Sequence, residues 1–453
     1  MQVAVQAHPH PQTTLTSAQF AAAMAGFRLA PGARIAVGVS GGGDSMALVR
    51  LLAAWAVPHK VSVHALTVDH RLREAAAHEA RQVAAWLDLH DIPHAVLCWN
   101  DGPHARTLTR SAQSAAREAR YGLMTDWCQA NACSHLFVAH HADDQVETFL
   151  LRLSRGSGVD GLAAMAPTVL RDGIVIARPL LGFTKVQLIE ACRAMDQPWI
   201  DDPSNTSAAS TRVRFREAQA LLEREGLTRD RLLATVGHLQ RARAALDHAV
   251  AELLDRGSWD AYGVARLSVT DLLAAPEEIA LRALARVLTA AGGQAYGPRF
   301  ESLTRLYGRT TSGPWSDATL HGCLISRAGD VLLVSREPAQ ITEDKTLGPN
   351  ASVIWDGRFK LSLTATWPTP VFTISRLGST DLKALSEAQR AKVGDIPARV
   401  RATLPALFDS DGLAALPHGG YMRADVAALP GFRLGLTSIS AEKAGCSSGD
   451  AKL

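Results

Sequence analysis

Short apolar runs alternate with amphipathic stretches along the first part of the chain, and this pattern predicts a strand–helix repeat. Four apolar runs have the length of strands. They span residues 35–39, 61–68, 94–99 and 134–139. Apolar residues recur at helical spacing in three stretches after them, at residues 74–90, 111–131 and 143–155. Such alternation indicates right-handed crossovers, and therefore a parallel sheet with helices on both faces.

Polar residues follow three of the predicted strands directly. Ser40 comes after the first strand, Asp69 after the second and His140 after the fourth. Ligands of such sheets bind beyond the carboxyl ends of the strands. We therefore expect these three residues to lie around one crevice.

The remainder of the chain predicts a helical part and then a mixed part. Apolar residues recur at helical intervals from residue 212 to residue 256, and a second helical unit is expected at residues 270–291. Residues 318–325 and 331–334 predict a hairpin, because two apolar runs flank a turn. A small mixed domain is expected to start near residue 355.

Composition bounds the class of protein. The 453 residues are long enough for two or three domains, and 47% hydrophobic content fits globular cores. The net charge of +3 is close to neutral, so a nucleic-acid surface would have to be a local cluster of arginines. Six scattered cysteines without a Cys-x-x-Cys pair favour reduced thiols in the cytoplasm. No run reaches the length of a membrane span.

A glycine-rich loop joins the first strand to the first helix. It consists of Ser40, Gly41, Gly42, Gly43, Asp44 and Ser45. Backbone N–H groups and the helix dipole at such a turn attract phosphate. No lysine precedes Lys60, which excludes the Walker A loop, and the dinucleotide pattern G-x-G-x-x-G is absent. The alternative is a turn that only allows a helix to pack tightly on the sheet.

The loop resembles that of the PP-loop ATP pyrophosphatases, which split ATP between its α and β phosphates. The resemblance implies that Ser40, Ser45 and the three glycine amides hold the leaving pyrophosphate, and that Asp44 places Mg²⁺. The fold class is then α/β, with a PP-loop (HUP/Rossmann-like) domain, a helical domain and a small α+β domain. The expected segments are an extension and docking helix at 1–31, the catalytic domain at 32–216, further domains at 217–340 and 350–436, and a disordered tail at 437–453.

Residues 140–148, His-His-Ala-Asp-Asp-Gln-Val-Glu-Thr, open a predicted helix beyond the fourth strand. Asp144 and Glu147 are three residues apart and share a helix face, so they can hold one cation between them. Carboxylates in a first turn also stabilise the helix dipole, which explains the acids without any function. That explanation leaves His140, His141 and Gln145 unaccounted for.

Together these motifs resemble the bacterial tRNA(Ile)-lysidine synthetases. The matching segments, in order, are residues 40–45, 68–73, 116–121, 140–148, 155–162, 178–181 and 202–216. There are two departures from the family pattern. Arg71 stands where glycine is common, and the segment at residues 163–165 lacks the usual glycine.

The resemblance implies that L-lysine replaces O2 of the wobble cytidine in an isoleucine tRNA with a CAU anticodon. ATP first adenylates that oxygen, pyrophosphate leaves, and the lysine amine then displaces AMP. Asp44, Asp144 and Glu147 are the expected catalytic residues. Asp144 and Glu147 would hold the lysine ammonium, with Asp144 as the proton acceptor. Arg120 and Arg212 are expected to bind other parts of lysine, and Asp69 and His141 are expected to bind the nucleotide.

Several assignments stay open from sequence alone. Arg117 suits a surface ion pair as well as a ligand contact. The family resemblance assigns tRNA binding to the later domains, and the candidate phosphate contacts there are Arg212, Arg214, Arg216, Arg376, Arg399 and Arg401. Rival functions are a PP-loop tRNA thiolase, an amide-forming synthetase, and a nonenzymatic nucleotide- or RNA-binding protein. The lack of Cys-x-x-Cys argues against a thiolase that uses a metal cluster. Oligomeric state is not readable.

Overall fold

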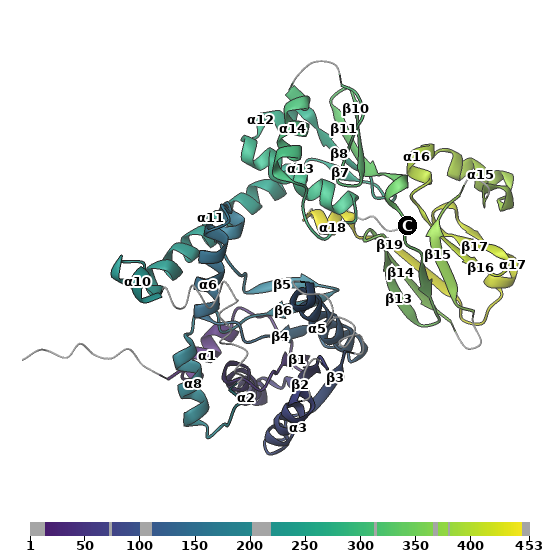
Figure 1. Ribbon diagram of the computed structural model, residues 1–453. Helices are drawn as coiled ribbons and strands as arrows, with labels where there is room; N and C mark the ends of the chain where they lie inside the picture. The colour runs from purple at the N-terminus through teal and green to yellow at the C-terminus, as the bar shows by residue number, and fades with distance from the viewer. Residues whose placement is uncertain are drawn as a thin grey trace, which may run out of the picture. The chain divides into compact units, whose positions relative to one another are not determined.

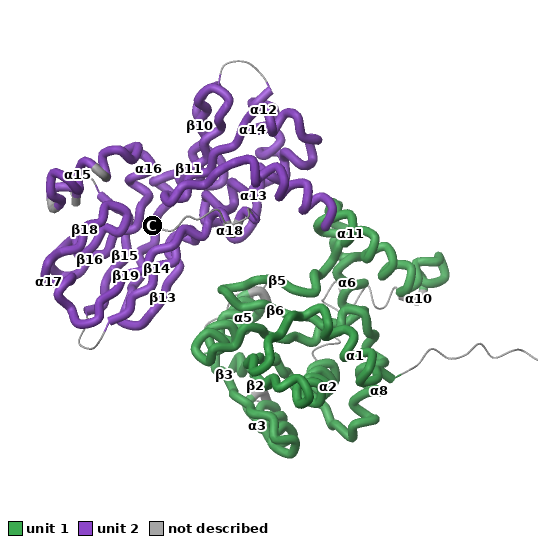
Figure 2. Tube along the Cα trace, turned by 180° about the vertical axis from the view of Figure 1, so that it is seen from behind, with its two compact units in different colours: residues 1–243 green, residues 244–453 purple. Residues whose placement is uncertain are grey.

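A computed structural model of the chain describes residues 14–71, 75–99, 111–201, 219–311, 315–365, 370–378 and 381–445. Two compact units make up the chain, Met1–Arg243 and Ala244–Leu453. Figure 2 colours them separately. The boundary lies within one long helix, α11 (Arg229–Leu254). The additional domain boundaries expected at residues 216 and 340 stay predictions.

A six-stranded sheet forms the centre of the first unit (Figure 1). Its strands are β1 (Arg34–Gly38), β2 (Ser62–Asp69), β3 (His94–Cys98), β4 (His135–Phe137), β5 (Thr168–Arg171) and β6 (Ile174–Ala177). Their order is β3-β2-β1-β4-β6-β5, and only the edge strand β5 is antiparallel to its neighbour. The predicted parallel sheet is confirmed, whereas the β5–β6 hairpin was not anticipated.

Helices cover both faces of this sheet because successive residues of β1 point to opposite sides. Ile35 and Val37 pack in one core with helices α1 (Ser17–Met24), α2 (Gly43–His59), α3 (Ala75–Asp88) and α8 (Lys185–Ala194). Ala36 packs in the other core with α5 (Ser111–Ala130). Two short helices, α6 (Ala142–Leu153) and α7 (Val159–Leu162), follow β4. The expected docking helix is α1, where Phe20 and Met24 are buried.

The register of the central strands aligns their carboxyl ends. Gly38 of β1 pairs with Leu66 of β2, and Val37 pairs with Phe137 of β4. The loop after β1 and the segment after β4 therefore start at the same edge of the sheet. This edge is where the sequence places its polar motifs.

The second unit begins with helices packed on an antiparallel sheet. The sheet order is β7-β8-β11-β10-β9. Its strands are β7 (Ser258–Trp259), β8 (Ala265–Ser268), β9 (Ala318–Leu320), β10 (Cys323–Ala328) and β11 (Val331–Arg336). The helices are α12 (Val269–Ala274), α13 (Glu277–Ala291) and α14 (Phe300–Thr311). The short helix α10 (Gln219–Arg224) comes earlier in the chain and belongs to the first unit. The predicted hairpin is β10–β11. The segment expected to be helical thus also contains a sheet.

Two smaller antiparallel sheets complete the second unit. One has the order β12-β15-β16-β17-β18 and the other β13-β14-β19. Their strands are β12 (Lys345–Leu347), β13 (Ala351–Trp355), β14 (Phe359–Thr364), β15 (Phe372–Arg376), β16 (Pro405–Asp409), β17 (Gly412–Leu416), β18 (Tyr421–Met422) and β19 (Arg433–Ser438). Helices α15 (Glu387–Gly394), α16 (Ala398–Arg401) and α17 (Ala424–Ala427) join them.

The prediction of a disordered tail at residues 437–453 is wrong for the first part of this segment. Ser440–Ala444 form helix α18, which packs against α13, and Ala444 is fully buried. The rest of the tail, residues 446–453, lies outside the described residues. None of the described helices combines the length and the apolar character that crossing a bilayer requires.

Candidate active site

The glycine loop is closed by the side chain of Ser45. Its hydroxyl donates a hydrogen bond to the Gly42 carbonyl at 2.9 Å and accepts one from the Ser40 N–H at 3.1 Å. Gly42 caps α2 without a side-chain hydrogen bond, so no side chain of the described residues takes up the first N–H groups of this helix. These donors and the helix dipole give the loop the character of an anion seat.

Packing explains two of the three glycines. A Cβ at Gly43 would lie 2.3 Å from Cδ1 of Ile189, and one at Gly41 would lie 2.9 Å from Ile200. Gly41 also has a φ of +85°, which side chains disfavour. At Gly42 the nearest atom would be 3.7 Å away. Tight packing, the alternative explanation for the glycine loop, therefore accounts for Gly41 and Gly43. It does not account for Gly42.

A cavity of about 480 Å³ opens beside the loop. Among the residues that line it are Ser40, Gly42, Asp44, Ser45, Thr67, His70, Glu79, Arg120, Tyr121 and His140. The predicted Ser40, Asp44 and Arg120 thus meet at one cavity. Glu79 of α3 was missed, because nothing in its local sequence distinguishes it from a surface acid.

Asp69 does not line this cavity. Its carboxylate accepts a hydrogen bond from the Arg71 N–H at 2.8 Å, and Arg71 has a φ of +53°. This hydrogen bond holds Arg71 in the left-handed conformation that glycine adopts more easily. The first departure from the family pattern is therefore accommodated locally, and His70 lines the cavity in place of Asp69.

His141 lies buried among three carboxylates. Its Nε2 is 3.5 Å from Asp44 Oδ2 and 3.6 Å from Asp144 Oδ2, and its Nδ1 is 3.4 Å from Asp143 Oδ2. Burial alone would lower the pKa of His141, but Asp143, Asp44 and Asp144 together raise it to about 10. The imidazole is therefore a cation that joins the glycine loop to the start of α6.

Asp143 connects this group to two other helices. Its carboxylate accepts a hydrogen bond from the Lys185 N–H at 2.8 Å and forms an ion pair with Arg229 Nε at 2.8 Å. Burial acts to raise the pKa of Asp143, but His141, the Lys185 N–H and Arg229 lower it to about 2. Sequence reasoning passed over Asp143 because both partners are distant in the chain.

Asp144 caps the helix that it begins. Its Oδ2 accepts a hydrogen bond from the His141 N–H at 3.0 Å, which completes a capping box. Glu147 is buried on the same helix, and neither acid lines the cavity. Asp144 is therefore connected to the glycine loop through His141, which lies beside both Asp144 and Asp44. Arg212, the second expected lysine contact, lies outside the described residues, as do Arg214 and Arg216.

Gln145 has a structural explanation. Its amide nitrogen donates to the Met165 carbonyl at 2.9 Å, and its amide oxygen accepts from the Met165 N–H at 2.8 Å. This pair of hydrogen bonds fixes the second segment that departs from the family pattern, in which Ala164 has a φ of +52°. The helix dipole did not explain Gln145, and the structure shows that this side chain stabilises a turn.

Arg120 reaches the cavity beside Tyr121. Burial lowers the pKa of Arg120, as does the neighbouring charge of Arg117, while Tyr121 raises it. The guanidinium carbons of Arg117 and Arg120 lie 5.3 and 5.4 Å from the centre of the Tyr121 ring. Arg117 forms no ion pair with any described residue. Its surface ion-pair alternative is not realised there.

The oxygens present suit a magnesium ion. Asp44 Oδ1 is buried and has no hydrogen-bond partner among the described residues. Carboxylate oxygens are the ligands that Mg²⁺ prefers. No cluster of three metal-ligating side chains occurs in the described part of the chain, so phosphate oxygens and water would have to complete the coordination.

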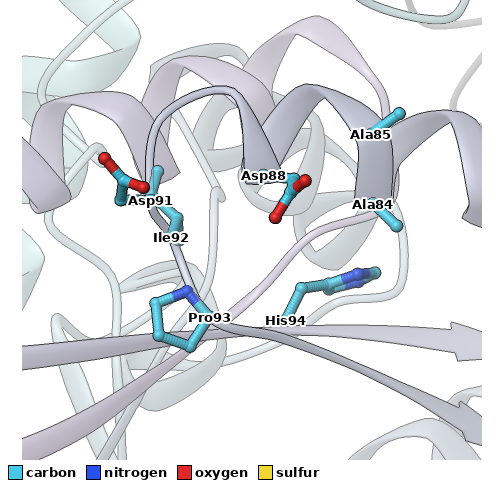
Figure 3. A pocket seen from close by; sticks show the side chains of 7 residues that line it. All are labelled: Ala84, Ala85, Asp88, Asp91, Ile92, Pro93 and His94. Carbon is cyan, nitrogen blue, oxygen red and sulfur yellow. The ribbon is translucent and has the colours of Figure 1, made fainter.

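A second hollow lies at the opposite end of the strands (Figure 3). It is lined by Ala84, Ala85, Asp88, Asp91, Ile92, Pro93 and His94, where α3 ends and β3 begins. Asp88 and Asp91 are exposed, and His94 Nε2 lies 2.8 Å from the Thr67 hydroxyl. It lacks the uncapped helix start of the first cavity, so we place the site at the glycine loop.

Known proteins resemble this chain over most of its length. A family profile described as a PP-loop domain matches residues 13–222. The tRNA(Ile)-lysidine synthase of Ruegeria pomeroyi is 39% identical over 340 residues, which cover 74% of this chain and 78% of that protein. That of Wolbachia pipientis is 35% identical over 73% of this chain and 77% of that protein. That of Methylobacterium nodulans is 39% identical over 68% and 93% respectively.

These identities extend over at least two thirds of each chain, well beyond the glycine loop. They confirm the resemblance that the sequence motifs indicated. The chain belongs to the tRNA(Ile)-lysidine synthase family.

Proposed function

We propose that this protein joins L-lysine to C2 of the wobble cytidine in an isoleucine tRNA with a CAU anticodon, releasing AMP and pyrophosphate. Membership of the family supports the reaction as a whole. The observation that carries the proposal is that the glycine loop and Arg120 line one cavity. An anion seat and a carboxylate-binding side chain thus face the same space.

The glycine loop is the proposed seat of the ATP phosphates. Ser40, Ser45 and the backbone amides of the loop would hold the β and γ phosphates, which leave together as pyrophosphate. Asp44 would hold Mg²⁺ through the buried oxygen described above. The ion neutralises charge on the phosphates when it is bound. His141 would position Asp44 for this task, because it is the imidazole beside that carboxylate.

Activation of the base is necessary because the cytosine C2 carbonyl is a poor electrophile. In the proposed first step, O2 of the cytidine attacks the α phosphate and the bond to the β phosphate breaks. In the second step the lysine ε-amine adds at C2, and AMP leaves with the former O2. Donors of the loop would stabilise charge that develops on the phosphates, commonly the largest contribution to such catalysis.

Lysine must lose a proton before it attacks, because its amine is protonated at neutral pH. We assign Asp144 and Glu147 to the ammonium group and Asp144 to the proton. Arg120 would hold the lysine carboxylate, since a planar guanidinium matches it. Arg212 stays a second candidate for lysine.

Pyrophosphate release under four conditions distinguishes this function from its rivals. The protein is incubated with ATP alone, with tRNA, with lysine, and with both. We expect sustained release only with both substrates present. A thiolase would show no response to lysine, and a nucleotide- or RNA-binding protein would release no pyrophosphate.

A further inference from the structure

Three arginines surround the ring of Tyr121 at the edge of the cavity, and a fourth, Arg178, lies nearby. The guanidinium carbons of Arg117, Arg120 and Arg171 lie 5.2 to 5.4 Å from the ring centre. Arg178 comes from the end of β6 and donates a hydrogen bond to the Ala166 carbonyl at 2.9 Å. Burial lowers the pKa of Arg178, Tyr121 acts to raise it and Arg117 acts to lower it, so Arg178 lies close to both side chains.

The cluster lacks matching negative charge. Within the described part of the chain, Arg171 is paired with Glu118 and Asp172, but no carboxylate oxygen lies within 4 Å of Arg117, Arg120 or Arg178. The Nε atoms of Arg120 and Arg178 are buried without a hydrogen-bond partner. Buried donors of this kind are costly unless a ligand satisfies them. The group is therefore built to receive an anion.

The cluster extends from the cavity to the surface. Arg120 lines the cavity, Arg178 is half-buried, and Arg117 is exposed. Tyr121 is only 4% exposed, so its ring packs among the guanidinium groups and is not available to stack on a base. A single small carboxylate is matched by one planar guanidinium. The remaining charges, spread outward from the cavity, fit an anion that is itself extended.

We propose that Arg117, Arg171 and Arg178 bind the phosphodiester backbone of the RNA strand on either side of the nucleotide that enters the cavity. This inference rests on the proposed function, which requires one base to reach the cavity. The phosphates on either side of this nucleotide cannot enter the cavity with the base and must lie at the mouth of the cavity. Arg120 remains with lysine in this arrangement, and Arg171 exchanges its exposed partner Glu118 for phosphate.

Binding of the CAU-anticodon isoleucine tRNA to the full-length protein, measured over a series of salt concentrations, tests the inference. Arg117→Gln and Arg178→Gln should each weaken binding about tenfold and reduce the slope of log Kd against log salt by about 1. Their KM values for lysine and ATP should stay within about twofold of wild type. Arg178→Lys, which keeps the charge, should restore most of the slope.

The matched control is Arg193→Gln on α8. Arg193 is 61% exposed and paired with Glu190, and its loss should leave the slope unchanged. Arg178→Gln removes the hydrogen bond to Ala166 and can affect folding. Arg117→Gln removes an exposed side chain without a hydrogen bond to any described residue, so it still decides the inference.

An unchanged slope in Arg117→Gln would overturn the inference. So would unchanged tRNA binding together with a raised KM for lysine, which would assign the whole cluster to the amino acid. If the wild-type protein binds tRNA but forms no lysidine, the proposed function fails, and the slopes still decide whether these arginines bind phosphate.

Discussion

His141 Nε2 lies 3.5 Å from Asp44 Oδ2, across the gap between the start of α6 and the glycine loop. The same nitrogen is 3.6 Å from Asp144 Oδ2. One imidazole thus bridges the carboxylate assigned to magnesium and the carboxylate assigned to the lysine amine. In the proposed mechanism, His141 therefore connects the two steps of the reaction.

Replacing His141 should impair catalysis through Asp44. His141→Ala removes the cation that positions this carboxylate, and we expect pyrophosphate release to fall about 10- to 100-fold. His135→Ala, at the amino end of β4, is the control and should stay within about twofold of wild type. Undiminished release by His141→Ala over a range of magnesium concentrations would show that Asp44 needs no such support.

Asp144→Asn separates two roles of one side chain. An asparagine oxygen can still accept the hydrogen bond from the His141 N–H, so the helix cap is kept while the proton acceptor is lost. Lysine incorporation should fall about 10²- to 10⁴-fold. The variant also loses one of the three carboxylates beside His141, so its free energy of unfolding is measured alongside to separate this effect from the loss of chemistry. Normal incorporation would remove Asp144 from the chemistry and leave it a capping residue.

Gln145→Ala should reduce stability. The change removes both hydrogen bonds to Met165 and leaves the half-buried Met165 N–H without its partner, while the Met165 carbonyl keeps only a 3.4 Å hydrogen bond from Gln240. This loss should cost about 2 kcal/mol in denaturant unfolding. Gln129→Ala, which loses one exposed hydrogen bond to the Asp172 carbonyl, should cost less than about 1 kcal/mol. Equal costs in the two variants would contradict the structural role of Gln145.

The Arg229–Asp143 ion pair should couple the start of α11 to the site. A double-mutant cycle with Arg229→Met and Asp143→Asn should give a coupling energy of about 1 kcal/mol in unfolding experiments. The more exposed pair Arg193–Glu190 serves as the control and should give about 0.3 kcal/mol. A coupling no larger than that of the control pair would mean that Arg229 does not hold α6.

His418 should make the second unit sensitive to acid. Burial beside Tyr262 and Phe359, together with the charge of Arg358, lowers the pKa of His418 to about 4, although the hydrogen bond to the Ala261 carbonyl acts to raise it. The unfolded chain, with a pKa of about 6.5, then binds more protons between pH 6.5 and pH 4. Stability should fall through this window as pH decreases, by up to about 3 kcal/mol.

The matched variant for this pH dependence is His418→Gln, whose amide can still donate to Ala261. It should unfold with a weaker dependence on pH than wild type between pH 4 and 6.5. Parallel pH profiles for the two proteins would exclude His418 as the source.

The first four strands along the chain were predictable because they read as apolar runs, and three of them, β1, β2 and β4, are buried from both sides. The β5–β6 hairpin was not, since each strand has four residues and β5 is largely exposed. In the sheet β7-β8-β11-β10-β9 of the second unit, the β10–β11 hairpin was predicted, but β7 and β8 were missed for a related reason. Strand β8 is only four residues long and runs directly into α12.

The site was predictable where chemistry and chain order coincide. Ser40 and Asp44 belong to one six-residue loop, which can be read directly from the sequence. Asp143 gains its role from Lys185 and Arg229, and Arg178 approaches Tyr121 of α5 from the end of β6. Such contacts depend on the tertiary fold. Gln145 misled the sequence argument because a polar residue in a motif can serve a turn as well as a reaction.

Mass analysis of the wobble nucleoside tests the central claim most directly. The CAU-anticodon isoleucine tRNA is incubated with the protein, ATP and isotopically labelled lysine, and the nucleoside and ATP products are then identified. We predict a cytidine that carries the labelled lysine in place of its O2, with AMP and pyrophosphate in equal amounts. An unmodified cytidine, or ADP and orthophosphate as the products of ATP, would contradict the account.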